Sequence, residues 1–155
     1  MIGRDDLGFL LAKATQRWNE LLAEGFAAAG YGDIRASYGS VLVPLFEEDG
    51  LRMGELARRS RLSKQTMTQL VRRLEREGLV ERRPDAADGR ASRIFLTARS
   101  RAFEPVAAEV LDELDRLVRD HLDDEQVEEL KAALRELLAL GREAAMTSGA
   151  PSGQK

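Results

Sequence analysis

The sequence predicts a mainly α-helical fold with a small β-hairpin wing, that is, a winged helix-turn-helix joined to a helical dimerisation region. Apolar residues recur at three- and four-residue intervals over most of the chain, which is the spacing of amphipathic helices. Two short runs, 79–83 and 92–96, flank a loop that contains Asp-Gly, as the strands of a hairpin do. Only 4 of the 155 residues are proline, so few positions interrupt the helices.

The basic residues are concentrated in the middle of the chain. Residues 51–101 hold 14 Lys/Arg and 6 Asp/Glu, whereas residues 1–50 hold 4 and 8 and residues 102–155 hold 6 and 13. The whole chain has a formal net charge of −3, yet its middle segment is strongly positive. Because electric fields act locally, such a segment attracts phosphate whatever the distant carboxylates do. We therefore expect double-stranded DNA as a partner.

Composition also excludes several classes of function. The chain has no cysteine, which excludes disulfides, thiol sensing and Cys-ligated metals. One histidine and scattered carboxylates offer no clustered metal ligands, so we expect neither a metal nor another cofactor. No nucleophile with a base, paired-carboxylate cleft or phosphate-binding glycine loop is evident, so we do not expect an enzyme. No apolar run is long enough to span a membrane and no signal peptide is evident, which favours the cytoplasm.

The first two helices follow from spacing and from their ends. The apolar face of the first helix begins at Leu7 and ends at Phe26, and Gly30 and Gly32 terminate this helix. A second helix is expected from an N-cap at Asp33 to the acidic stretch that follows Phe46. Pro44 lies inside it and should kink it, unless the helix is shorter, because proline removes a backbone donor.

A helix-turn-helix follows. A short helix over residues 53–60 turns at Arg61-Leu62 into a second helix, which Ser63 caps and whose core face is Met67, Leu70, Val71 and Leu74. Its outer face is polar, and Gln, Lys and Thr are residue types that recognise base edges. We expect base contacts from Lys64, Gln65, Thr66, Thr68 and Gln69, and phosphate contacts from Ser63, Arg72 and Arg73.

The hairpin is expected to form a wing with an arginine at its tip. Its loop spans residues 84–91, and the Asp-Gly pair suits a turn that needs positive φ. Arg90 can enter the minor groove, where negative potential is concentrated, and Asp88 could hold it through a charge-assisted hydrogen bond. The alternative is that Asp88 and Arg90 form only a solvated surface pair.

Two further helices complete the chain. Thr97 is expected to cap a long helix with an apolar face from Phe103 to Val118, and residues 123–126 have the spacing of a capping box for the last helix. The expected organisation has three parts: a helical dimerisation region made of residues 1–32 and 98–146, a winged helix-turn-helix lobe at 33–97, and a disordered tail at 147–155. His121, at the end of the long helix, is expected to be structural because a cation there favours the helix dipole.

This order of parts resembles the MarR family of bacterial winged-helix regulators over roughly residues 5–145. The most specific pieces are Gly54-Glu55-Leu56-Ala57, the stretch 70–80, and Asp88-Gly89-Arg90 followed by Leu96-Thr97. The resemblance implies a homodimer, intertwined through its first, fifth and sixth helices, that binds an inverted-repeat operator. It also implies release by a small anionic or aromatic effector. Gly89 and Ser92 stand where relatives often carry another basic residue, which should weaken the grip of the wing on phosphate.

Effector pockets in that family commonly lie between the dimerisation helices and the DNA-binding lobe. The aromatic residues closest to that region in the sequence are Trp18, Phe26, Tyr31, Tyr38 and Phe46, and Arg17 or Arg35 could pair with a carboxylate. The alternative for each aromatic residue is an ordinary place in the core, which is the commoner role at helical spacing.

One observation supports a dimer independently of the resemblance. The apolar stripes of the flanking helices add more hydrophobic surface than one protomer can cover, and pairing would bury it. Two-fold symmetry then sets recognition helices about 34 Å apart, one duplex turn, which matches an inverted repeat. We expect a dimeric sequence-specific transcription regulator, a repressor released by a small molecule. The alternative is a winged-helix protein-interaction adaptor without an operator of its own.

Overall fold

The structure is a computed structural model, and it describes residues 1–141. The predicted tail at 147–155 and the last residues of the predicted dimerisation region lie outside the described residues. The described residues form two compact units, one over residues 1–112 and one that begins at residue 113, with the boundary inside a long helix.

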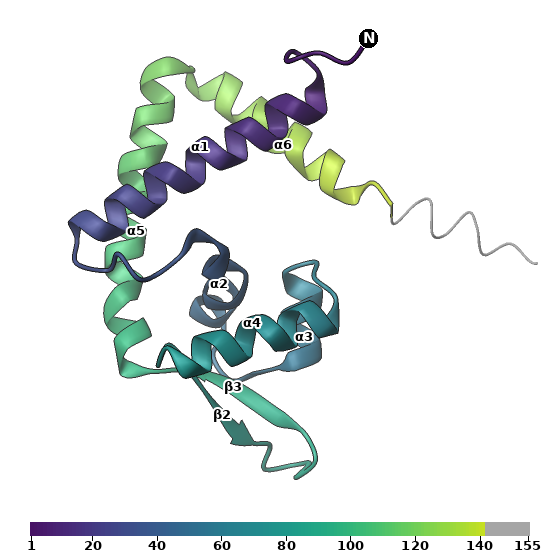
Figure 1. The fold of residues 1–155 in the computed structure, drawn as a ribbon, viewed down its shortest axis with the longest axis vertical. Coiled ribbons are helices and arrows are strands. Elements are labelled where there is room, and N and C mark those ends of the chain that lie inside the picture. The colour runs from purple at the N-terminus through teal and green to yellow at the C-terminus, as the bar shows by residue number, and fades with distance from the viewer. Residues whose placement is uncertain (142–155) are drawn as a thin grey trace, which may run out of the picture. The chain divides into compact units, whose positions relative to one another are not determined.

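The architecture confirms the predicted fold class, because helices dominate and the strands form one small antiparallel sheet (Figure 1). The elements in chain order are α1 (Leu7–Ala28), η1 (Ala36–Tyr38), α2 (Gly39–Glu47), β1 (Leu51–Arg52), α3 (Met53–Arg59), α4 (Lys64–Arg76), β2 (Val80–Pro84), β3 (Ser92–Leu96), α5 (Ala98–His121) and α6 (Asp124–Ala139).

The second helix departs from the prediction at its start. Asp33 does not cap it; its carboxylate accepts a hydrogen bond from Arg99 at 2.5 Å, which lowers the pKa of Asp33 below its ordinary value. The chain instead forms the single 3₁₀ turn η1, and α2 begins at Gly39. The prediction failed because a distant arginine binds the carboxylate that a local cap would have used.

Pro44 lies inside α2, which continues past it to Glu47. Because proline has no N–H, the carbonyl oxygen of Ser40 lacks its helical donor. The hydroxyl of Ser60, at the end of α3, donates a hydrogen bond to that oxygen. The adjoining helix therefore satisfies the acceptor that the proline leaves, and α2 tolerates it.

The sheet has one more strand than the hairpin that the sequence predicts. The order is β1-β3-β2, with Leu51 opposite Ile94 and Arg52 opposite Arg93. The hairpin runs from the pair Val80–Leu96 to the pair Pro84–Ser92. A strand of two residues has no alternation to detect, so no sequence pattern indicates β1.

The core of the segment 33–97, here called the lobe, forms beneath α4. Met67, Val71 and Leu74 are fully buried, as predicted. Leu70, predicted to join them, is only partly buried, which makes that prediction wrong. The buried face is narrower than the 100°-wide stripe that the spacing allowed. The other fully buried hydrophobic residues of the lobe are Tyr38, Val41, Leu42, Leu45, Leu56, Leu79 and Ile94.

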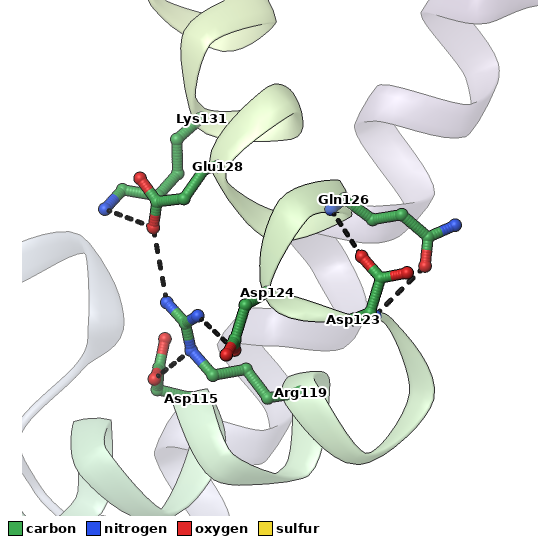
Figure 2. A network of polar contacts seen from close by, with 7 residues as sticks. All are labelled: Asp115, Arg119, Asp123, Asp124, Gln126, Glu128 and Lys131. Carbon is green, nitrogen blue, oxygen red and sulfur yellow. Dashed lines mark hydrogen bonds and ion pairs between the residues drawn. The ribbon is translucent and has the colours of Figure 1, made fainter.

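A polar network closes the turn between α5 and α6 (Figure 2). The predicted capping box is confirmed: the Asp123 carboxylate accepts from the amide of Gln126 at 2.8 Å, and the Gln126 side chain accepts from the amide of Asp123 at 3.0 Å. Beside it, the Arg119 guanidinium contacts Asp115 at 2.7 Å, Asp124 at 2.8 Å and Glu128 at 3.4 Å. One arginine thus joins the last turns of α5 to the first turns of α6.

Candidate nucleic-acid interface

Helix α4 begins at a confirmed cap. Ser63 Oγ accepts a hydrogen bond from the backbone amide of Thr66 at 3.1 Å and lies 2.8 Å from the Thr66 hydroxyl. The hydroxyl of Thr68 donates to the carbonyl of Lys64 at 2.7 Å. Three of the residues predicted to contact DNA therefore also stabilise the start of the helix. Lys64, Gln65 and Gln69 are exposed.

Arg73 has internal partners at the other end of α4. Its Nε lies 3.5 Å from Glu77 Oε1, and its guanidinium lies 5.9 Å from the centre of the Tyr38 ring. The Tyr38 hydroxyl donates to the same glutamate oxygen at 2.8 Å. The pKa of Tyr38 is raised above its ordinary value, chiefly by burial and then by this carboxylate. Arg72, one residue earlier, is exposed.

A groove of about 570 Å³ separates the first half of α4 from the wing. We call it the wing groove, and its polar lining comes from Arg52, Glu55, Lys64, Thr68, Arg82, Arg90 and Ser92. The structure thus brings Arg90, a predicted contact on the wing, beside Lys64 and Thr68, two predicted contacts on α4. Glu55, the acid in the groove, accepts hydrogen bonds from Arg58 and Arg59, which lower its pKa. The groove is therefore electropositive.

Arg52 and Arg82 are wing-groove residues that sequence reasoning missed. Arg52 pairs with Asp85 at 2.5 Å, and Arg82 lies 3.7 Å from Glu75. Arg82 lies on the first strand of the predicted hairpin, so its place in the wing could be predicted. The sequence pattern did not show that its side chain is on the face of the strand that is turned toward α4. Arg52 could not be assigned because β1 was not recognised.

The base of the wing is organised by Asp85, which sequence reasoning also missed. Its side chain is 2% exposed, and its carboxylate accepts hydrogen bonds from Arg52 Nε at 2.7 Å, Arg93 Nε at 3.2 Å and the amide of Ala87 at 2.9 Å. Arg93 also donates to the carbonyl of Gly50 at 2.9 Å. The Ala87 amide and then Arg52 hold the pKa of Asp85 below its ordinary value. This carboxylate ties all three strands and the wing loop together.

The tip of the wing differs from the predicted arrangement. Asp88 Oδ1 accepts a hydrogen bond from the backbone amide of Arg90 at 3.0 Å and none from its guanidinium. The predicted bond between the two side chains is therefore wrong. Within residues 1–141, the Arg90 guanidinium makes no hydrogen bond or ion pair. Gly89 does not adopt positive φ, contrary to the prediction from Asp-Gly. Asp88 therefore shapes the turn and leaves the arginine charge available to a partner.

A separate apolar pocket of about 290 Å³ lies within the first unit. Phe26, Phe46 and Arg35, from the predicted effector set, line it, together with Phe103 and Ala107, which were not in that set. The other members of the set do not. Trp18 lies elsewhere on α1, Tyr31 contacts the Phe103 ring with centroids 5.1 Å apart, and Tyr38 is buried against Glu77. Arg17 is exposed and pairs with Glu20 at 3.2 Å.

Neither a metal cluster nor a membrane-spanning helix occurs in the described part of the chain. No group of three or more His, Asp or Glu side chains there is placed to hold a metal ion. None of the helices in that part combines the length and the apolar character that crossing a bilayer requires.

Comparisons with known proteins agree on one family. The model of the MarR family matches residues 44–91. An HTH-type transcriptional regulator of Methylorubrum extorquens is 42% identical over 64 residues, 41% of this chain, and the chain spans only about a third (33%) of that protein. An HTH-type transcriptional repressor of Mycobacterium tuberculosis is 36% identical over 93 residues, which cover 60% of this chain and 67% of the repressor.

A solved structure extends the likeness to most of the chain. The MepR–DNA complex of Staphylococcus aureus matches with a TM-score of 0.74 and 25% identity, covering 86% of this chain and 97% of MepR. These relatives are transcription regulators rather than enzymes.

Proposed function

The chain belongs to the MarR family of transcription regulators, and we propose that it is a homodimeric repressor that binds an inverted-repeat operator and is released by a small molecule. The wing groove carries the DNA-binding part of this proposal. It places the exposed cations Lys64 and Arg90 beside the polar face of α4, which matches the need to neutralise phosphates while side chains reach base edges. The proposal locates the protein in the cytoplasm, with the DNA that it binds.

Exposed apolar side chains support the homodimer. Leu130, Leu134 and Leu137 of α6 are 46%, 38% and 36% exposed at a spacing that puts them on one face. Leu7 and Leu10 of α1 are 63% and 47% exposed. A second protomer would remove this surface from water. Two-fold symmetry would also place the α4 helices of the two protomers one helical turn apart on the same side of a DNA duplex.

Two observations support the regulatory part. The Mycobacterium tuberculosis relative is named as a repressor, which favours the same sign of regulation here. The apolar pocket lined by Phe26, Phe46 and Phe103 offers a small aromatic molecule a hydrophobic site, and Arg35 at its rim could pair with an anionic group.

The experiment that tests DNA binding is selection from random duplex DNA, followed by titration of the enriched site at several salt concentrations. An operator reader gives an enriched inverted repeat and a steep fall of affinity with salt, because bound phosphates release counterions. Weak binding without sequence enrichment would overturn the proposal and favour an adaptor that docks on protein instead.

Arg90→Ala is expected to weaken operator binding by about tenfold while the melting temperature stays unchanged. The guanidinium makes no hydrogen bond or ion pair among the described residues, so the whole effect should fall on DNA binding. Fluorescence anisotropy with the selected operator measures it, and Arg4→Ala, at an exposed site near the N-terminus, is the control. Undiminished affinity of folded Arg90→Ala would rule out a contact from the wing tip.

Gly89→Lys is expected to tighten operator binding by about two- to fivefold, the effect of one exposed ion pair. Apart from the two adjoining residues, no atom lies within 4 Å of a Cβ placed at this position, and the backbone does not require glycine. The new ammonium lies next to Arg90 and should steepen the salt dependence, whereas Gly89→Ala should change neither quantity. A lysine variant that binds like the alanine variant would show that the wing tip does not approach phosphate.

A further inference from the structure

The basic segment of the chain uses arginine and lysine very unequally. Residues 51–101 contain 13 arginines and a single lysine, Lys64, and the whole sequence has only three other lysines. The two residue types differ in reactivity. A guanidinium stays protonated in proteins, whereas a lysine amine can lose its proton and then attack an acyl group. Lys64 is therefore the one cation of this segment whose charge can be removed by acyl transfer to a lysine amine.

Lys64 is the first residue of α4, and its ammonium does not hold the fold together. A positive charge in the first turn of a helix opposes the helix dipole. The side chain is exposed, and its ammonium makes no hydrogen bond or ion pair with any residue of 1–141. The Thr68 hydroxyl donates to the backbone carbonyl of Lys64, which a change at the side chain does not alter. Neutralising the ammonium should therefore leave α4 intact.

The surroundings of this amine attract anions. Lys64 lines the wing groove together with Arg52, Arg82 and Arg90, and the acid in the groove, Glu55, is already paired with two arginines of α3. A concave surface with an excess of positive charge raises the local concentration of small anions. The groove, about 570 Å³ in volume, has room for a small phosphorylated molecule. A negatively charged acyl donor is thus drawn to the place where Lys64 can react with it.

The other lysines that the structure describes lack this setting. Lys13 of α1 donates a hydrogen bond to Gln16 at 2.9 Å, and its ammonium lies 5.6 Å from the centre of the Phe9 ring. The Lys131 ammonium of α6 lies 3.5 Å from Glu128 Oε1. Both lysines are exposed and neither lines the wing groove. Their rates of acylation therefore serve as the reference for ordinary surface lysines.

We propose that Lys64 is acylated by a small acyl phosphate attracted to the wing groove, and that this modification weakens operator binding. The unprotonated amine attacks the carbonyl carbon of the acyl phosphate. A C–N bond forms, the C–O bond to the phosphoryl group breaks, and phosphate leaves with the electron pair and takes up the amine proton. The product is a neutral amide, so the groove loses one positive charge. The acylation depends only on the groove, whereas its effect on DNA rests on the proposed function.

Incubation of the full-length protein with acetyl phosphate tests the site. Peptide mass spectrometry measures the fraction acetylated at each lysine as a function of time. Lys64 should react at least about fivefold faster than Lys13 and Lys131, and added salt should reduce this preference because it screens the attraction of an anion. Equal rates at the three lysines would overturn the assignment of the site.

Two reagents that deliver the same acetyl group separate attraction from accessibility. N-hydroxysuccinimidyl acetate is neutral, whereas its sulfonated form carries a negative charge. The sulfonated reagent should favour Lys64 over Lys13 more strongly than the neutral reagent does. Arg90→Ala should reduce this difference, and Arg4→Ala, at an exposed site near the N-terminus, should not. The same preference with both reagents would show that the groove does not attract the donor, and it would overturn that part of the proposal.

Operator affinity tests the consequence for DNA binding. Lys64→Gln resembles the acetylated side chain and should weaken binding by about tenfold and lower the salt slope by about one, because one phosphate is no longer neutralised. Lys64→Arg retains the charge without a reactive amine, so it should keep most of the affinity and not respond to acetyl phosphate. Lys13→Gln is the control for loss of a lysine elsewhere, and melting temperatures confirm that each variant folds.

The outcomes separate this inference from the proposed function. Wild-type protein that selects an inverted repeat, while its Lys64 reacts no faster than Lys13, overturns the acylation site alone. Preferential acetylation of Lys64 with undiminished operator affinity overturns its effect on DNA binding. Failure of the wild-type protein to select any sequence overturns the proposed function itself, and the acetylation rates then still decide whether the groove directs an acyl phosphate to Lys64.

Discussion

Asp85→Ala is expected to weaken operator binding by about tenfold or more, although Asp85 need not touch DNA. Its carboxylate holds Arg52, Arg93 and the Ala87 amide, and hydrogen bonds to charged groups of this kind are among the stronger ones in proteins. Without them the wing loop and Arg90 lose their fixed position relative to α4. In addition, two arginines that lie opposite each other on β1 and β3 lose the anion between them.

The measurement is operator affinity with protein concentration and salt held constant, together with amide hydrogen exchange over residues 84–92. Asp85→Asn keeps the shape and should lose most of the affinity, because it retains only neutral acceptor capacity. Asp5→Ala is the matched control, since it removes a carboxylate from an exposed site outside the wing. Equal affinity of Asp85→Asn and wild type, with unchanged exchange in the loop, would show that Asp85 does not position the wing.

The pH dependence of this carboxylate follows from the direction of its shift. The Ala87 amide, Arg52 and Arg93 hold the pKa of Asp85 below its ordinary value of 3.8. A depressed pKa in the folded state means that the stabilising contribution is complete above the unfolded value and is lost as pH falls through the folded one. Order in the wing should therefore be independent of this group from about pH 5 to 8 and decline only below about pH 4.

Leu74→Ala is expected to lower the free energy of unfolding by about 2 to 5 kcal/mol, the usual cost of truncating a fully buried leucine. Leu74 lies on the inner face of α4 and is completely buried. Leu70→Ala, one turn earlier on the same helix, should cost clearly less because that side chain is only partly buried and borders a surface groove. Both variants replace leucine by alanine on the same helix, so the change in helix propensity is nearly the same for the two. The difference between their free energies of unfolding therefore reports packing.

Urea denaturation at a fixed protomer concentration measures both variants, since the stability of a dimer depends on concentration. Val71→Ala provides a smaller truncation at a second fully buried site. Equal losses for Leu70→Ala and Leu74→Ala would mean that Leu70 becomes buried in the assembled protein, and the exposure seen in one chain would not describe the functional state.

Features set by neighbours in the chain could be predicted from the sequence. The Ser63 cap, the Asp123–Gln126 capping box and the helices around them depend on residues three or four positions apart, and each appears in the structure as expected. The basic segment also indicated a nucleic-acid partner, because charge composition needs no knowledge of the fold.

Features set by distant partners could not be predicted in the same way. Asp33 looked like a helix cap but binds Arg99, and Pro44 is tolerated because Ser60 supplies the missing donor. Sequence spacing cannot rank such competing partners, because their proximity exists only after the chain has folded.

The sequence by itself determined the fold class, the family resemblance and the polar face of α4. Only the tertiary structure decided how the wing is held and which side chains share a groove with α4. The dipeptide Asp88-Gly89 drew attention to the tip of the loop, whereas the buried anion is Asp85, at the loop's beginning. The physical reason is that Arg52 and Arg93 reach Asp85 only when β1 pairs with β3, over a separation that local periodicity does not encode.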